Sequence, residues 1–221
     1  IRIEELMLKK KVVGITQRVD KVESYDEYRD ALDQKLVDWV VQSGFIPVPV
    51  PNTLIDTTLP DSGQPILDNW LTTVKIDAIL LSGGNDIGDI KQRDLTEEYL
   101  LSWAEKNRKP VLGICRGMQM IGVYAGSNLI KADGHVGTHH QLQIKNTHGQ
   151  SLSGLVNSYH HLVLDSCPDK FQILAESEDG KIEAMMHKEL PWEGWMWHPE
   201  REDQFVKNNQ KRFKKLMNNG R

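Results

Sequence analysis

Four short apolar runs divide the first half of the chain, at residues 12–16, 45–50, 78–82 and 110–114, and each predicts a buried strand. Two prolines in the second run favour a strand at the edge of a sheet. Helical patterns lie between the runs. Because strands and helices alternate, the chain is predicted to form a parallel sheet that helices cover on both faces.

Polar residues mark where these helices are expected to begin and end. Ser24 and Glu27 form a capping-box pattern, which predicts a helix start at this point. Two more helices are predicted over residues 95–106 and 118–125, and a last, basic helix within residues 200–217. The apolar face of the first helix would consist of Tyr28, Leu32, Leu36, Trp39 and Val40.

The pattern changes after residue 134 to a succession of short strands. These are predicted near residues 140–146, 155–165, 171–177, 181–187 and 194–198. Asp179 and Gly180 form a hairpin-type turn between two of them. We therefore expect one α/β domain over residues 1–221, with an open, mostly parallel sheet and added antiparallel strands. Residues 1–6, which precede Met7, are expected to be a tag or fusion remnant.

Composition argues against a nucleic-acid-binding protein, a membrane-spanning protein and a disulfide-rich protein. The net charge of −4 gives no electrostatic reason to expect nucleic acid as a partner. No apolar run approaches the roughly 18 residues that a membrane span needs, and no signal peptide is visible. Two cysteines, Cys115 and Cys167, cannot form a disulfide framework, so we expect a reducing compartment, the cytoplasm.

Cys115 lies between two glycines, Gly113 and Gly117, where a predicted strand gives way to a predicted helix. The pattern G-x-C-x-G in this context is typical of a nucleophile elbow, a strained turn that presents a reactive side chain above a sheet. The helix N-terminus would favour the thiolate and could hold an oxyanion. The alternative is a small buried cysteine beside two packing glycines.

A cysteine nucleophile needs a base, and the base needs a group that orients it. Of the eight histidines, His198 in WHPE has Glu200 two residues on, and on a strand these two side chains face the same way. The loop SGGND (82–86) could turn its N–H groups toward an anion. Each could instead be an ordinary strand end or turn. All lie at the carboxyl ends of predicted strands, which favours a common site.

In this order, LLSGGND, PVLGICRGMQMI, VNSYHH and MWHPERE resemble the class I glutamine amidotransferase fold, which is flavodoxin-like, and within it the stand-alone γ-glutamyl hydrolases. The resemblance implies that Cys115 is the nucleophile, His198 the general base and acid, and Glu200 the third member of a triad. It implies that Gly84 and Arg116 offer backbone N–H groups to the oxyanion. The expected reaction is cleavage of a γ-glutamyl amide through a γ-glutamyl thioester.

The same resemblance implies a set of substrate contacts. Gln119 matches a position that lies against the glutamyl group, and residues 156–161 match a segment that binds its amino and carboxylate ends. The full set of expected contacts is Gly83, Asn85, Gln119, Ser158, Tyr159, His160 and His135.

The short loop after GGND makes the chain resemble γ-glutamyl-CDP-amidate hydrolases most, which implies a nucleotide conjugate as substrate and a role in polysaccharide phosphoramidate biosynthesis. A basic side chain would then meet a diphosphate, with Arg93 and Arg116 as candidates. Alternatives are a glutaminase subunit that supplies ammonia to a separate synthase, and a binding protein on the same fold. Oligomeric state stays open, a homodimer included.

Four histidines cluster in the sequence and raise the question of a metal site: His135, His139, His140 and His148. They form no helix-borne H-x-x-x-H motif and no cysteine lies among them, so we expect no metal and no cofactor. Surface loops or substrate contacts are the favoured interpretation.

Overall fold

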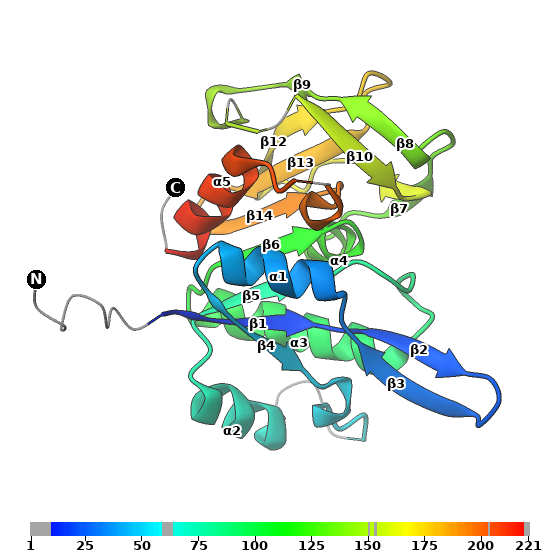
Figure 1. Ribbon diagram of the computed structural model, residues 1–221, viewed down its shortest axis with the longest axis vertical. Helices are drawn as coiled ribbons and strands as arrows, with labels where there is room; N and C mark the ends of the chain where they lie inside the picture. Colours follow the sequence, from blue (N-terminus) through cyan, green and yellow to red (C-terminus); the bar gives the residue numbers. More distant parts are fainter. Residues whose placement is uncertain (1–9, 59–63, 150, 153, 203, 219–221) are drawn as a thin grey trace, which may run out of the picture.

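The computed structural model describes residues 10–58, 64–149, 151–152, 154–202 and 204–218 (Figure 1). The expectation of a remnant at residues 1–6 lies outside these ranges. Within them, no helix has both the length and the apolar character needed to cross a membrane.

One eight-stranded sheet organises the chain, in the order β4-β1-β5-β6-β14-β13-β12-β9. Its parallel part consists of β4 (Ile46–Val50), β1 (Val12–Thr16), β5 (Ala78–Leu81), β6 (Val111–Ile114) and β14 (Trp192–Trp195). Three strands extend it in antiparallel fashion: β13 (Ile182–His187), β12 (Phe171–Glu176) and β9 (Gln143–Ile144). The predicted fold class is confirmed, and the proline-containing strand β4 lies at the sheet edge.

Helices cover both faces of this sheet. The hydrophobic cores sort them: α1 (Gln34–Gln42) and α5 (Lys207–Met217) pack on one face, and α2 (Pro65–Val74), α3 (Lys91–Lys106) and α4 (Arg116–Tyr124) on the other. Successive side chains of β5 point alternately into the two hydrophobic cores. Leu80 joins the core of Trp39 and Phe213, whose rings lie 4.5 Å apart, while Ile79 and Leu81 join the opposite core.

The helix start predicted at Ser24 is wrong. An antiparallel hairpin of β2 (Arg18–Val22) and β3 (Glu27–Ala31) occupies this segment. The helix begins only after Asp33, whose carboxylate accepts a hydrogen bond from the Lys35 N–H at 2.8 Å. A contact distant in sequence favours the hairpin, because the Asn85 side chain hydrogen-bonds both backbone groups of Val19.

Two small sheets lie beside the main one. β10 (Leu155–Tyr159) pairs with β8 (Val136–Gln141), and β11 (Leu162–Leu164) pairs with β7 (Leu129–Lys131). The predicted strand 155–165 is thus two strands in different sheets, while α2 and β7 were not predicted. Single 3₁₀ turns complete the fold: η2 (Asn52–Leu54), η3 (Thr147–Gly149) and η4 (Pro199–Arg201).

Candidate active site

Cys115 occupies a tight turn between β6 and α4, with φ 52° and ψ −109°. Such a conformation costs a non-glycine residue on the order of 1–3 kcal/mol. The Cys115 N–H donates to the Trp195 carbonyl on β14 at 2.7 Å, which helps to hold the turn. The first turn of α4 follows at once, so its free amides and the positive end of its dipole lie next to Cys115.

The two flanking glycines are required by close packing. A Cβ atom on Gly117 would lie 2.1 Å from the Leu81 carbonyl oxygen, and one on Gly113 would lie 2.4 Å from the Gly117 backbone. The start of α4 therefore presses directly against β5 and β6. Any side chain at either position would push the helix, and with it the cysteine, out of place.

His198 lies at the same end of the sheet as Cys115, because it follows the carboxyl end of β14, the parallel neighbour of β6. Its Nδ1 lies 2.7 Å from Glu200 Oε1. Since a carboxylate only accepts, Nδ1 carries a proton, and Nε2 is the ring nitrogen that remains for Cys115. The ring lies within hydrogen-bonding reach of Cys115, and both side chains border Gly83, on which a Cβ atom would come within 2.6 Å of the ring.

The protonation state of His198 depends on these two neighbours. Burial of the ring by itself lowers its pKa, but the hydrogen bonds and negative charges of Cys115 and Glu200 outweigh burial and raise the pKa of His198 to about 9. The imidazolium form is therefore favoured at neutral pH. A protonated ring beside a nucleophile is the form that can donate a proton to a leaving nitrogen.

Replacing Glu200 by Gln is expected to lower the pKa of His198 from about 9 toward its ordinary value, because both the hydrogen bond and the negative charge of Glu200 raise it. Since the folded-state pKa lies above the unfolded value of about 6.5, the interaction stabilises the folded protein fully below pH ~6.5 and is lost as the pH rises through about 9. NMR titration of the ring checks the shift.

The matched control for this titration is Glu189→Gln, which removes an exposed carboxylate. It should leave the His198 titration unchanged. If His198 titrates at the same pH in Glu200→Gln as in the wild type, Glu200 does not orient or charge the ring.

Asn157 holds the backbone of His198, a role that was not predicted. From β10, its side-chain N–H donates to the His198 carbonyl at 2.8 Å and its oxygen accepts from the His198 N–H at 2.9 Å. An amide side chain carries its donor and its acceptor side by side, so it can pair with both backbone groups of one residue. Asn157 lies inside the VNSYHH motif, so the amide was the available signal.

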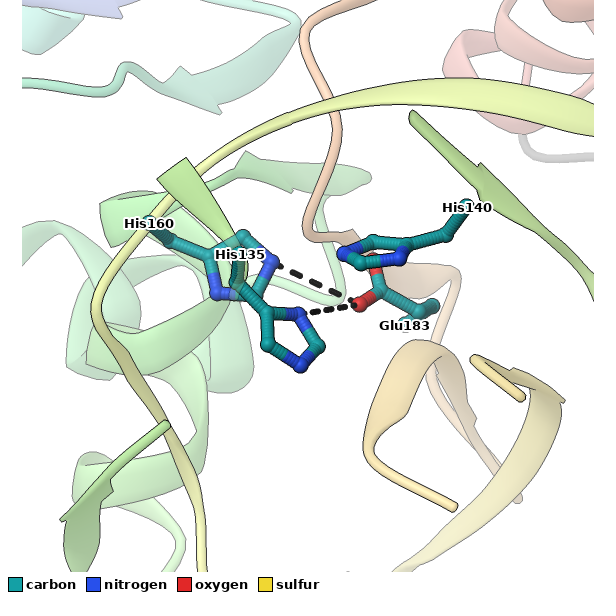
Figure 2. Close-up of side chains that lie close together, drawn as sticks. All are labelled: His135, His140, His160 and Glu183. Atoms are coloured by element: carbon teal, nitrogen blue, oxygen red, sulfur yellow. Dashed lines mark ion pairs between the residues drawn. The ribbon is translucent and has the colours of Figure 1, made fainter. Parts of the chain in front are cut away.

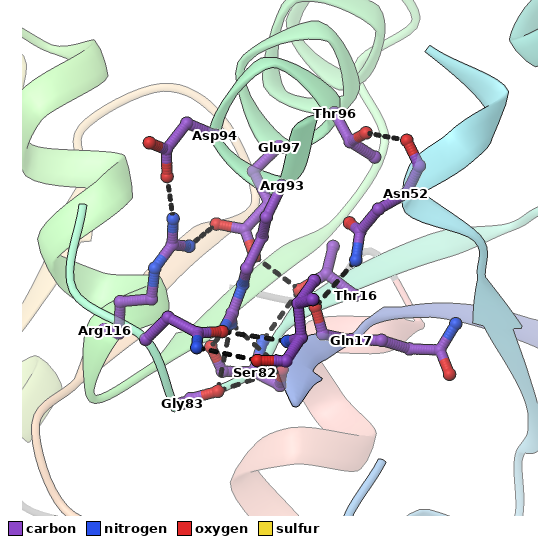
Figure 3. A network of polar contacts seen from close by, with 12 residues as sticks. Thr16, Gln17, Asn52, Ser82, Gly83, Arg93, Asp94, Thr96, Glu97 and Arg116 are labelled. Atoms are coloured by element: carbon purple, nitrogen blue, oxygen red, sulfur yellow. Dashed lines mark hydrogen bonds and ion pairs between the residues drawn. The ribbon is translucent and has the colours of Figure 1, made fainter. Parts of the chain in front are cut away.

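Arg93, which is fully buried, holds the loop that follows β5, residues 82–86. Its guanidinium donates to the Ser82 carbonyl at 2.8 Å and to the Gly83 carbonyl at 3.0 Å (Figure 3). The Gly83 carbonyl and the Gly84 N–H belong to one trans peptide unit and point in opposite directions. Because Arg93 holds the carbonyl, the Gly84 N–H points away from Arg93.

Arg93 and Arg116 share a buried carboxylate, Glu97, and Arg116 also pairs with Asp94 (Figure 3). Burial opposes the charged form of Glu97, but Arg116 and Arg93 hold its pKa below the ordinary value. The prediction that either guanidinium group meets a substrate diphosphate is therefore wrong. Both are occupied under the loop, and only the backbone of Arg116 remains a candidate for substrate contact.

The other predicted substrate contacts fall into two groups: Tyr159 and Gln119 are available for contact, and the remaining side chains are engaged elsewhere in the protein. Tyr159 lies edge-on to the His198 ring, with ring centres 5.9 Å apart, and is 45% exposed. Gln119 donates to the Leu162 carbonyl at 2.8 Å, and its side-chain oxygen is buried without a hydrogen-bond partner among the described residues. Away from His198, the Ser158 hydroxyl donates to the His135 carbonyl and Asn85 binds Val19, while His135 and His160 belong to a histidine cluster described below.

A small cavity of about 60 Å³ opens beside His198. Gly83, Gly84 and Glu200 line it, together with two arginines that were not predicted as site residues, Arg18 and Arg201. The Arg201 guanidinium lies 4.8 Å from the centre of the Tyr159 ring, in cation–π geometry. Both arginines bring positive charge to the rim of the site, where Arg18 also pairs with Asp20 at 2.7 Å.

Comparison with known proteins agrees with this geometry. The model of the glutamine amidotransferase class-I family matches residues 21–212. The γ-glutamyl-CDP-amidate hydrolase of Campylobacter jejuni is 32% identical over 200 residues, which cover 86% of this chain and 90% of the relative. The γ-glutamyl-γ-aminobutyrate hydrolase of Escherichia coli O157:H7 is 23% identical over 227 residues, which cover 89% and 88%.

A solved structure shares the fold. A glutamine amidotransferase of Thermotoga maritima superposes with a TM-score of 0.62 at 15% identity, covering 94% of this chain and 84% of that chain. Together with the family match over most of the sequence, this confirms the resemblance drawn from the four motifs. The chain belongs to the glutamine amidotransferase class-I family, as a hydrolase of that family.

Proposed function

We propose that the protein hydrolyses a γ-glutamyl amide through a thioester on Cys115. One observation carries this proposal: a strained cysteine at a strand–helix turn lies within hydrogen-bonding reach of a histidine whose other nitrogen contacts a carboxylate at 2.7 Å.

The proposed reaction has two steps. The Cys115 sulfur attacks the γ-carbonyl carbon, the C–N bond breaks, and the His198 imidazolium gives its proton to the leaving nitrogen. His198, now neutral, takes a proton from water as the water oxygen attacks the thioester, and the Cys115 thiolate leaves. The products are glutamate and the freed amine or amidate.

We propose that two backbone amides stabilise the oxyanion of both steps. The Gly84 N–H points away from the carbonyl that Arg93 holds, and the Arg116 N–H opens α4 directly after the nucleophile. Loss of one such donor typically lowers the rate by about 100- to 1,000-fold. Arg93 is fixed by Glu97 and holds the loop that carries Gly84. The Gly84 N–H is therefore held in position before substrate binds.

We further propose that the leaving group is a nucleotide amidate of the γ-glutamyl-CDP-amidate type. The relative from Campylobacter jejuni supports this substrate, and Arg18 and Arg201 at the rim of the cavity supply the charge that a diphosphate requires. A role in polysaccharide phosphoramidate biosynthesis stays a prediction of the resemblance.

Glutamate release from a substrate panel tests both proposals. The panel contains glutamine, γ-glutamyl-γ-aminobutyrate and γ-glutamyl-CDP-amidate, and we expect the highest kcat/KM with the last. Preference for glutamine alone would contradict the substrate proposal. Glutamine turnover that rises on addition of a separate synthase would instead favour the alternative, a glutaminase that hands ammonia to that synthase.

Replacing Arg201 by Gln is expected to raise KM for γ-glutamyl-CDP-amidate by about 10- to 100-fold, because a charge-assisted hydrogen bond to phosphate contributes about 1.5–3 kcal/mol. Turnover of glutamine, which has no phosphate, should change by less than about 3-fold. Arg29→Gln removes an exposed arginine on β3 and is the control. Equal losses on both substrates would show that Arg201 supports the site rather than the nucleotide.

A further inference from the structure

Three histidines and a glutamate from separate segments meet in a second cluster, which contains none of the residues Cys115, His198 and Glu200 (Figure 2). His135 precedes β8, His140 lies on β8, His160 follows β10, and Glu183 lies on β13 of the main sheet. One nitrogen or oxygen atom from each of the four lies within 4.8 Å of all the others. These are nitrogen and carboxylate ligands of the kind that zinc prefers.

The separations within the cluster suit a shared ion better than direct hydrogen bonds. Glu183 Oε1 lies 3.6 Å from His135 Nδ1 and 3.4 Å from His160 Nε2. Hydrogen bonds between such atoms are typically about 2.7–3.2 Å long. Two ligand atoms on one tetrahedral zinc lie roughly 3.4 Å apart, given metal–ligand distances of about 2.0–2.1 Å.

Three of the four side chains are buried and His140 is half-buried, and most of their polar atoms have no hydrogen-bond partner among the described residues. Glu183 is 0% exposed, His135 1% and His160 3%. Among the described residues, both Glu183 oxygens, His135 Nδ1 and His140 Nε2 have no hydrogen-bond partner, and neither ring nitrogen of His160 has one. A buried carboxylate without hydrogen bonds is costly unless a cation balances it.

An outer carboxylate orients one of the rings. Asp179 Oδ2 lies 3.1 Å from His135 Nε2, and the Ser177 hydroxyl donates to the other Asp179 oxygen at 2.6 Å. When Nε2–H donates a hydrogen bond to Asp179, the neutral ring has no proton on Nδ1, the nitrogen that faces Glu183. A carboxylate behind a histidine ligand is the usual arrangement around protein-bound metals, where it fixes the ring and its tautomer.

We propose that His135, His140, His160 and Glu183 bind one zinc ion. Four protein ligands fill a tetrahedral shell, which makes the site structural rather than catalytic. The expectation of no metal rested on sequence spacing, which included neither His160 nor Glu183. His139 and His148, the other histidines of that stretch, are exposed and lie outside the cluster.

The ion would join the two-stranded sheet of β8 and β10 to the main sheet. His140 is opposite Val156 in the register of β8 and β10, and Glu183 lies on β13 next to β14. β10 also carries Asn157, which holds the backbone of His198. Bound zinc would therefore brace the strand that positions the proposed general base.

A metal-free arrangement is the competing explanation. The contact with Glu183 and the charge of Asp179 raise the pKa of His135 against the effect of burial. A protonated His135 could then balance Glu183 without an ion. The two explanations differ in zinc content, which can be measured directly.

Zinc content is measured on untagged protein, stripped with a chelator and then dialysed against zinc, because a histidine tag would bind the metal itself. We expect about one zinc ion per chain in the wild type, a higher melting temperature with zinc, and the intense visible absorption of tetrahedral cobalt when Co²⁺ replaces zinc. Glu183→Gln and His160→Asn should lose both zinc and the cobalt spectrum.

Two further variants sharpen the test. Asp179→Asn should weaken zinc affinity by about 10- to 100-fold, because it removes only the outer carboxylate. His139→Asn, which removes an exposed histidine next to His140, should bind zinc as the wild type does. A wild-type protein without stoichiometric zinc and without the tetrahedral cobalt spectrum would overturn the proposal, even if a cluster variant fails to fold. Wild-type affinity in Glu183→Gln would overturn it equally.

Discussion

Replacing Cys115 by Ser is expected to abolish glutamate release, with kcat lowered by about 10,000-fold or more, as for the loss of a nucleophile in other hydrolases. A serine hydroxyl is not ionised by a histidine in the way a thiol is, so the attack on the γ-carbonyl fails. The fold should persist, because serine is nearly isosteric and its N–H can still donate to Trp195. Steady-state kinetics and circular dichroism check the two expectations together.

The chain supplies a matched control in its second cysteine. Cys167 is half-buried next to Pro168, and burial raises the pKa of its thiol. Cys167→Ser should keep wild-type activity. If Cys115→Ser released glutamate as fast as Cys167→Ser, the thioester mechanism would be wrong. A wild-type protein that releases no glutamate from any γ-glutamyl substrate would instead favour a binding protein on this fold.

Replacing Glu97 by Gln is expected to lower the free energy of unfolding by about 3–5 kcal/mol, because removal of one member of a buried ion network leaves charges uncompensated. Arg93 is fully buried and Arg116 nearly so, and both pair with Glu97. Thr16 also donates to Glu97 at 2.7 Å. Glutamine keeps the volume, so the loss reports the charge, and urea titration measures it.

The same substitution should lower kcat, since Arg93 also holds the carbonyls of the loop that carries Gly84. Glu189→Gln, which removes an exposed carboxylate, is again the control and should change stability by less than about 0.5 kcal/mol. Unfolding curves that coincide for the two variants would show that Glu97 carries no net stabilisation.

The fold could be predicted where patterns are local. Buried strands such as 78–82 and 110–114 are short apolar runs, and the structure confirms them as β5 and β6. The helix start predicted at Ser24 was wrong because a capping box is only a weak local preference. The hairpin in its place is stabilised by hydrogen bonds from Asn85, which lies in another segment. Such long-range hydrogen bonds leave no trace in periodicity.

The same distinction applies to the candidate site. Cys115, His198 and Glu200 each lie in a short motif, and the structure brings them together at one sheet edge. The roles of Arg93 and Asn157 depend on partners in other segments, Ser82 at 11 residues from Arg93 and His198 at 41 residues from Asn157, which no local pattern contains. The cluster that His135 and His160 form with Glu183 was missed for this reason, since the β8–β10 pairing and a residue on β13 decide where these side chains lie.

The position of β14 has a consequence for how the protein becomes active during synthesis. It is the last strand of the sheet along the chain, yet it lies in the interior, between β6 and β13. A ribosome-bound chain that ends before it has the reactive sulfur but no imidazole to accompany it, and one edge of β6 stays unpaired. Under the proposed mechanism, truncated products of translation are expected to be inert, and hydrolysis becomes possible only once β14 and His198 have been added.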